Sequence, residues 1–213
     1  MTIQEFDTAL YDKLYDFFVE HEFEMNAPKK QFRRLTNNGF QNVLFSTSEY
    51  EGEIWLEVNL GVRINAVEQI VQQFLDNQKG FREDAMTVIV SVGKLTNNKY
   101  FRYKVVNEDD LESVCLAVKE FMRTQGFQFL NVYNKIESLD SLLNKNPHKP
   151  THYLYNQVHR CFKGAVLARL NFNPKFEQII LKYHHFLATL NAKQTHLERF
   201  DKLETFLTHY SPN

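Results

Sequence analysis

The sequence predicts an α+β fold: a five-stranded, largely antiparallel sheet packed with helices, followed by an all-helical C-terminal third. Three observations predict it. From Ile54 to Ile64 apolar residues alternate with polar ones, which is the two-residue period of a strand with unlike faces. Short connections join most of the predicted strands, and such connections favour antiparallel pairing. After Gly126 the apolar spacing becomes helical throughout.

The first predicted element is a helix that begins with the capping-box spacing of Thr2 and Glu5. Its apolar residues share one helical face: Phe6, Ala9, Leu10, Leu14, Phe17 and Phe18. Two strands, 31–36 and 40–47, follow. They are joined by Asn37-Asn38-Gly39, whose residue types favour the tight turn of a hairpin.

The clearest strand covers residues 53–64, and Asn65 is the expected N-cap of a helix over 67–75. The runs 86–92 and 100–106 then alternate like strands around a polar tetrapeptide, so we expect them to form a second hairpin with each other. These runs complete the five predicted strands.

The next predicted helix begins after Asn107, where acidic residues suit the positive end of the helix dipole, and Gly126 is its expected stop. Four further helices are expected near 136–143, 152–170, 174–190 and 193–208. Pro147 and Pro150 mark the one predicted boundary. It separates an α+β domain, 1–146, from a helical extension, 147–213, that packs on it as one unit.

Composition indicates a globular protein with an aromatic core. The 213 residues include 19 Phe and 10 Tyr, and aromatic rings bury large apolar areas, whereas Gly (7) and Pro (5) are too scarce for a disordered chain. Cys115 and Cys161 have no CxxC partner, which favours a reducing compartment. We find no signal-peptide pattern and no apolar run of membrane-spanning length, so the expected location is the cytoplasm.

Charge is unevenly distributed along the chain. The net charge is −1, but the stretch from His148 onward has nine Lys and Arg against four Asp and Glu, which is +5, and the remainder is −6. A mildly basic helical end could meet an acidic partner, yet nucleic-acid binding usually requires denser basic clusters. We therefore expect a solvated helical surface and no nucleic-acid partner.

The common catalytic signatures are absent: there is no phosphate-binding Gly-rich loop, no nucleophile elbow and no HExxH. His184 and His185 are adjacent, so their side chains point about 100° apart on a helix, and no carboxylate recurs four residues away. We expect surface or packing roles for the histidines, with no metal and no cofactor. A Cys161 nucleophile is also disfavoured, because buried cysteines are usually inert.

A family resemblance covers about the first 145 residues. It rests on Phe32-Arg33, Gln41-Asn42-Val43, Phe45-Ser46 and Val58–Val62, with Phe127–Leu143 as a closing stretch. In this order they resemble a bacterial domain-of-unknown-function family, number four-three-zero-four. The resemblance implies an α+β fold and a small bacterial protein. It implies no activity and supplies no catalytic residues to carry over.

The second face of the sheet is the candidate ligand or partner surface. Alternation places polar and aromatic side chains there, opposite the core face. These residues are Trp55, Glu57, Asn59, Arg63, Tyr100, Arg102, Lys104 and Arg33. Charged residues interleaved with aromatic ones suit the binding of a peptide, a protein or a polar ligand. The competing interpretation is that the C-terminal helices cover this face.

The leading hypothesis is a non-enzymatic protein-interaction module, with an immunity or antitoxin-like binder as one form. The alternative is a small enzyme or ligand-binding protein with a pocket between the sheet and the C-terminal helices, using Arg102, Glu57 and Tyr100. Single-stranded nucleic acid on the aromatic sheet is disfavoured by Glu53 and Glu57 on the same face. The sequence does not fix the partner, the substrate, the pathway or the oligomeric state.

Overall fold

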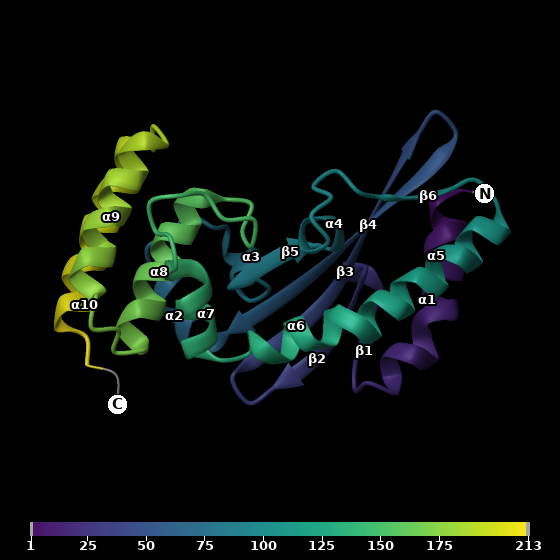
Figure 1. The fold of residues 1–213 in the computed structure, drawn as a ribbon, viewed down its shortest axis with the longest axis horizontal. Helices are drawn as coiled ribbons and strands as arrows, with labels where there is room; N and C mark the ends of the chain where they lie inside the picture. The colour runs from purple at the N-terminus through teal and green to yellow at the C-terminus, as the bar shows by residue number, and fades with distance from the viewer. Residues whose placement is uncertain (1, 212–213) are drawn as a thin grey trace. The chain divides into compact units, whose positions relative to one another are not determined.

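The structure is a computed structural model that describes residues 2–211 (Figure 1). The chain forms two compact units. The first contains residues 2–62 and 89–132, and the second contains Arg63–Val88 and residues 133–211. The boundary between the units differs from the one predicted after residue 146. The second unit begins at residue 133 in the C-terminal half and also includes the segment Arg63–Val88 from the N-terminal half. Among the described residues, no helix is both long enough and apolar enough to span a membrane.

The first unit holds most of a six-stranded sheet. The strands are β1 Glu24–Asn26, β2 Gln31–Thr36, β3 Gly39–Tyr50, β4 Glu53–Ile64, β5 Val88–Ser91 and β6 Tyr103–Val105. The chain leaves this unit near the end of β4 and returns to it at the start of β5. The helical segments of the unit are α1 Ile3–Val19, η1 Ala27–Lys29, α4 Val92–Leu95, α5 Glu108–Phe121, η2 Met122–Gly126 and α6 Phe127–Val132.

The sheet has the strand order β1-β2-β3-β4-β5, and β6 pairs with β4. β1 pairs antiparallel with β2, β2 with β3, and β4 with β6. The core face of β4 is buried as its alternation predicts, at Ile54, Leu56, Val58, Leu60, Val62 and Ile64. The predicted α+β class with a largely antiparallel sheet is confirmed. β1 is a sixth strand that was not predicted, because its three residues are too few to show an alternation of apolar and polar residues.

The predicted hairpin between 86–92 and 100–106 is wrong. β5 and β6 are each bonded to β4 and not to each other in the described sheet, and residues 92–95 between them form the short helix α4. β6 lies against the start of β4, with Ile54 opposite Val105. β4 is 12 residues long, whereas β5 and β6 have four and three residues, so β4 has room to pair with both short strands.

The core of the first unit is built from aromatic rings, as the composition predicts. The Phe18 ring of α1 stacks on Phe32 of β2 with centroids 4.4 Å apart, and Phe45 of β3 meets the edge of Phe32 at 6.0 Å. α5 lies beside α1, and Lys13 and Glu112 join the two helices at 2.7 Å. The buried rings supply much of the apolar area of this unit.

α5 starts as predicted, with a capping box between Asn107 and Asp110. Gly126, however, is not a stop. It lies in the π-helical turn η2, and α6 continues directly from Phe127. A glycine ends a helix when it adopts a positive φ, and Gly126 does not. The apolar positions Phe129 and Leu130 are buried beyond it and extend the packed face.

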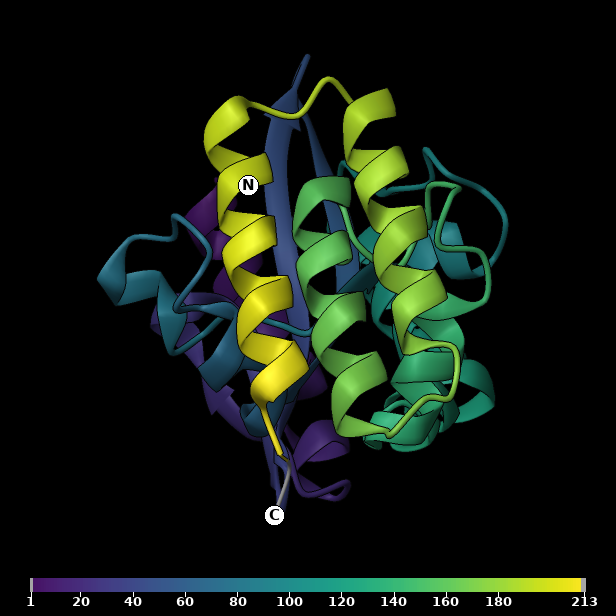
Figure 2. The same cartoon turned by 90° about the vertical axis from the view of Figure 1, so that its left-hand side faces the viewer.

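The second unit is helical apart from the strand ends that it shares. Its helices are α2 Asn65–Val71, α3 Lys79–Arg82, α7 Ile136–Asn144, α8 Gln157–Leu170, α9 Phe176–Thr189 and α10 Gln194–His209. Figure 2 shows α8 between α9 and α10, and it packs on both. Its nine residues from Arg160 to Ala168 are buried, since helices lie on several sides of it. The predicted helical C-terminal third is confirmed.

A predicted cap and a predicted helix start of this unit differ in the structure. Asn65 lies within α2 and makes no cap; its side chain instead accepts a hydrogen bond from Arg63 Nε at 2.9 Å. α9 begins at Phe176 rather than at Pro174, and Asn173 accepts from the backbone N–H of Lys175 just before the helix. In both places the asparagine bonds a near neighbour, which competes with capping.

A buried arginine ties α7 to α8. Arg160 is 1 % exposed and donates to the backbone carbonyls of Leu143 (2.6 Å), Asn146 (2.9 Å) and Lys149 (2.5 Å). Its guanidinium also lies over the Tyr183 ring at 5.4 Å. Carbonyls at and just beyond the end of a helix lack partners within it and carry partial negative charge. They hold this buried cation, which forms no ion pair with a carboxylate of residues 2–211.

Candidate functional site

The register of β4 and β6 creates an aromatic and charged cluster around Trp55. Lys104 lies directly opposite Trp55, and its ammonium is 4.8 Å from the indole centroid. Glu53 accepts a hydrogen bond from Trp55 Nε1 at 3.0 Å and pairs with Lys104 Nζ at 3.2 Å. The Tyr50 ring packs against Trp55 at 5.5 Å. Trp55 is thus fixed by three neighbours while it stays half-buried.

A second pair continues the cluster along the strand. Arg102 Nη2 lies 3.8 Å from Glu57 Oε2, and both side chains are partly exposed. Tyr100 precedes them outside β6; it is 82 % exposed, and Lys99 lies 5.3 Å above its ring. We define the Trp55 surface by these residues and the half-buried Lys94: Tyr50, Glu53, Trp55, Glu57, Lys94, Lys99, Tyr100, Arg102 and Lys104.

Electrostatic effects on this surface follow from its geometry. The hydrogen bond from Trp55, and then the one from Lys104, hold the pKa of Glu53 below its ordinary value. Burial lowers the pKa of Lys94; Glu57 opposes this effect and Lys99 adds to it. The surface carries four cations against two carboxylates, so it has an excess of positive charge.

Four of the eight residues selected from the sequence therefore form the pairs Trp55–Lys104 and Glu57–Arg102, and Tyr100 adjoins them. The other three have different surroundings. Asn59 is buried at 6 % exposure. Arg63 belongs to the second unit and donates to the carbonyls of Arg82 and Ala85, which fixes the end of α3.

Arg33 lies on β2, two strands away from β4 in the sheet order. Its Nε donates to Asn42 Oδ1 at 3.0 Å, and its guanidinium covers the Phe40 ring at 3.8 Å. Both contacts are to β3, which places Arg33 in a cross-strand packing role.

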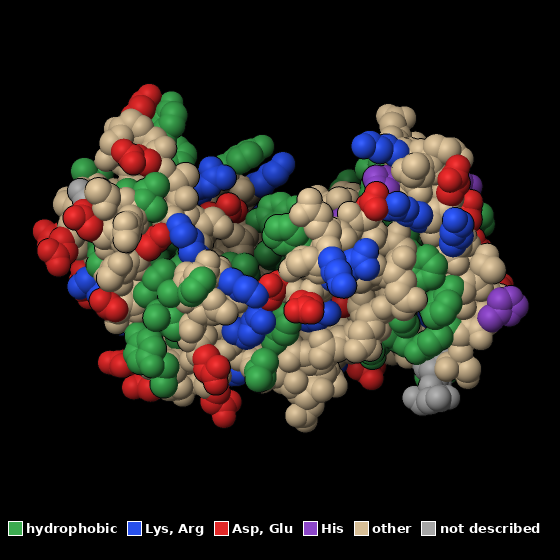
Figure 3. Space-filling view, turned by 180° about the vertical axis from the view of Figure 1, so that it is seen from behind, with side chains coloured by type: hydrophobic (Ala, Val, Ile, Leu, Met, Phe, Trp, Pro, Cys, Tyr) green, Lys and Arg blue, Asp and Glu red, His purple; other side chains and the backbone are tan. Residues whose placement is uncertain are grey.

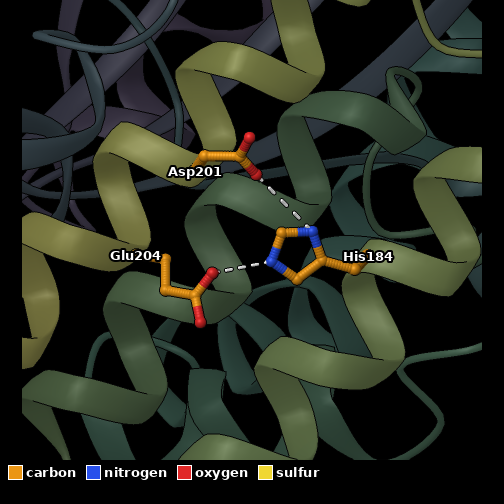
Figure 4. A group of neighbouring side chains, drawn as sticks. All are labelled: His184, Asp201 and Glu204. Carbon is orange, nitrogen blue, oxygen red and sulfur yellow. Dashed lines mark hydrogen bonds and ion pairs between the residues drawn. The ribbon is translucent and has the colours of Figure 1, made fainter.

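A histidine cluster joins α9 to α10 in the second unit (Figure 4). His184 Nε2 lies 2.7 Å from Glu204 Oε2, and His184 Nδ1 lies 3.8 Å from Asp201 Oδ1. The ring meets the edge of Phe200 with centroids 5.0 Å apart. This cluster has no local sequence signal, because both carboxylates come from α10 and not from the histidine's own helix.

The three residues of this cluster are of types that bind divalent cations, and their ligand atoms lie within 4.8 Å of one another. In the arrangement of Figure 4, however, each carboxylate meets a different ring nitrogen. The two carboxylates therefore lie on opposite sides of the imidazole ring. As placed, the cluster is a bridge that links two helices and fixes the imidazole ring.

A buried polar cluster lies between α2 and α8. Glu68 and Lys163 form an ion pair at 3.2 Å, and Gln72 donates to the other Glu68 oxygen at 2.8 Å. Lys163 also donates to the Met86 carbonyl. Burial, with further contributions from Lys163 and His196, lowers the pKa of His159 to about 4. Sequence patterns gave no sign of this cluster, because its members are distant in sequence.

Comparisons with protein-family models, with curated proteins and with solved structures found no match to this chain. The resemblance to the domain-of-unknown-function family therefore stays a prediction.

Proposed function

We propose that this chain is a non-enzymatic protein-interaction module that binds an acidic partner protein through the Trp55 surface. An immunity or antitoxin-like binder is one form of such a module. The observation that supports the proposal is the Trp55–Lys104–Glu53 arrangement, which holds a half-exposed indole ring in place beside exposed cations.

The residue types of the surface suit an interface. Trp, Tyr and Arg are enriched among the residues that contribute most binding energy, and the surface contains one Trp, two Tyr and one Arg. Tyr50 and Tyr100 are exposed, so they are available to a partner. Because its hydrogen bond to Glu53 and its contacts with Lys104 and Tyr50 already fix Trp55, binding would immobilise few additional side-chain rotamers.

Charge favours an acidic protein as the partner. The local excess of cations on the Trp55 surface would pair with an acidic patch of the partner and fix its register. On the face drawn in Figure 3, Lys and Arg side chains are interspersed with Asp and Glu side chains. Nucleic-acid binding relies on a continuous basic stripe, so the mixed distribution favours a protein over nucleic acid.

The enzyme alternative takes second place. Its polar groups were Arg102, Glu57 and Tyr100, of which Arg102 is paired with Glu57 and Tyr100 extends into solvent. A reacting group usually needs convergent neighbours that exclude water. We keep this alternative as an outcome of the experiment below.

The proposal places the module in a reducing compartment, the cytoplasm of a bacterium. Cys115 and Cys161 are free and buried. Burial raises the pKa of Cys115 to about 11 and that of Cys161 to about 12. Both thiols therefore stay protonated and inert at neutral pH, and neither contributes chemistry to the proposed function.

Co-purification from native cells tests the proposal. We expect wild-type protein to enrich one protein partner, and Trp55→Ala to weaken binding of the purified partner by about 30-fold or more, as for a hot-spot residue. Lys104→Glu should weaken it as well, by reversing a charge without removing the ring. Leu116→Ser, at an exposed position of α5, is the matched control. Enrichment of a small molecule or a nucleic acid in place of a protein would contradict the proposal.

A further inference from the structure

A polar pocket of about 520 Å³ lies in the second unit, between α7 and the start of α9. Its volume is within the range of sites for small molecules. Three lysines line it, Lys145 at the end of α7 and Lys175 and Lys182 along α9. Lys175, Gln178, Ile179 and Lys182 follow the i, i+3, i+4, i+7 spacing, so α9 presents one face to the pocket.

The positive charge of this pocket is not neutralised by ion pairs. Within the described part of the chain, none of the three lysine ammonium groups forms an ion pair with a carboxylate. Like charges gathered around one cavity repel one another, which is unfavourable unless an anion joins them.

The one carboxylate that lines the pocket is already engaged. Asp140 is 2 % exposed and accepts amide hydrogen bonds from Asn144 (2.5 Å), Asn171 (2.7 Å) and Asn173 (2.7 Å). The bonds from Asn171 and Asn173 hold α7 to the segment before α9, and the bond from Asn144 lies within α7. Asp140 is therefore part of the wall of the pocket rather than a counter-ion for its cations.

The start of α9 also lies at the pocket, and Glu177, the acidic residue of its first turn, does not line the pocket. The helix is 14 residues long, and its N-cap residue Lys175 makes no side-chain capping bond. Backbone N–H groups in a first helical turn lack partners within the helix, and together with the dipole they attract anions. Pocket, lysines and helix end are thus suited to the same kind of ligand.

We propose that this pocket binds a small molecule that carries phosphate groups, through Lys145, Lys175 and Lys182. Phosphate supplies several strong acceptor oxygens and more than one negative charge, which a single carboxylate does not. The remaining lining, which includes Ser141 and Gln178, offers hydrogen bonds to the body of such a ligand. The site is separate from the Trp55 surface and independent of the function proposed for it.

Calorimetric titration with inorganic pyrophosphate, repeated at several fixed ionic strengths, tests the proposal. We expect saturable binding to the wild-type full chain, and affinity that falls as salt is raised. Lys182→Gln alone should weaken binding by about tenfold, the effect of one charge-assisted hydrogen bond. The triple variant K145Q/K175Q/K182Q should abolish saturable binding.

A matched triple variant, K149Q/K193Q/K202Q, removes three exposed lysines of the same unit that do not line the pocket. It loses the same net charge, so it should bind pyrophosphate as wild type does. All six substitutions are at exposed positions, and circular dichroism confirms folding of both variants. Absence of saturable binding to wild type, or equal loss in the two triple variants, would overturn the proposal.

Discussion

Glu68 of α2 and Lys163 of α8 form a buried ion pair 3.2 Å apart, with 0 % and 5 % of their side chains exposed. Burying two charges costs desolvation free energy. Their mutual attraction offsets this cost only when hydrogen bonds also occupy their remaining donors and acceptors. Gln72 and the Met86 carbonyl supply those bonds. The pair therefore joins α2, α8 and the segment before β5 in the second unit.

Breaking this pair should destabilise the second unit strongly. Lys163→Met leaves the Glu68 carboxylate buried without its cation, and we expect a loss of about 3–5 kcal/mol of unfolding free energy. Far-UV circular dichroism in urea measures it, since most of the unit is helical. Arg199→Gln is the control: its pair with Asp76 is exposed, so the loss should stay below about 1 kcal/mol. Equal effects of the two substitutions would contradict the account.

Acid should weaken the second unit through His159. Its folded-state pKa is lowered from 6.5 to about 4, first by burial and then by the positive charges of Lys163 and His196, while Glu68 opposes the shift. Between pH 6.5 and 4 the unfolded chain binds a proton at His159 that the folded chain does not, so stability falls as pH falls through this window.

His159→Gln tests this pH dependence. Unfolding free energies of wild type and variant, measured from pH 7 to pH 4, should converge as the pH falls, because only wild type loses the His159 contribution. Titrating groups that do not interact with His159 act in both proteins and cancel in the difference. A difference between the two proteins that stays constant over the window would show that His159 titrates normally in the folded state.

Gly164 should not tolerate a side chain. A Cβ there would overlap the Tyr183 hydroxyl and lie 2.8 Å from Asn144 Oδ1, and Tyr183 is fully buried. We expect Gly164→Ala to cost about 1–3 kcal/mol, the usual effect of overpacking. Gly80→Ala is the control: nothing lies within 4 Å of its Cβ position in α3, so it should be neutral or stabilising.

A double-mutant cycle with Tyr183→Phe identifies the cause. If the hydroxyl is the main obstacle, G164A/Y183F should be less destabilised than the sum of the two single variants. Additive losses would mean that the alanine acts through some other contact of α8.

Much of the fold could be predicted from local patterns. α1 buries the face that its spacing predicts, and the burial of β4 alternates from Glu53 to Val58 as its sequence does, because each pattern records which side faces the core. From Asn59 onward both faces of β4 are buried, which the alternation did not predict. The pairing of β5 and β6 was missed since pairing depends on which partner strand is longest and nearest in space. Gly126 was misread because its conformation depends on the packing of the residues beyond it.

Local patterns likewise predicted only part of the candidate site. Alternation predicted that Trp55 and Glu57 share a face, and the β4–β6 register then placed Lys104 beside Trp55. Asp201 and Glu204 could not be connected with His184, because the rotation of α10 against α9 has no local sequence signal. The lysines of the pocket were hidden for the same reason: Lys145 comes from a different helix than Lys182.

The central claim is that a protein binds at the Trp55 surface, and site-specific photocrosslinking in native cells measures this most directly. A photoreactive phenylalanine analogue at position 100 lies on the surface, and the same analogue at exposed position 116 of α5 is the control. The account predicts a discrete protein adduct from position 100 that disappears with Trp55→Ala and is absent from position 116. No adduct at position 100, or the same adduct from both positions, would contradict it.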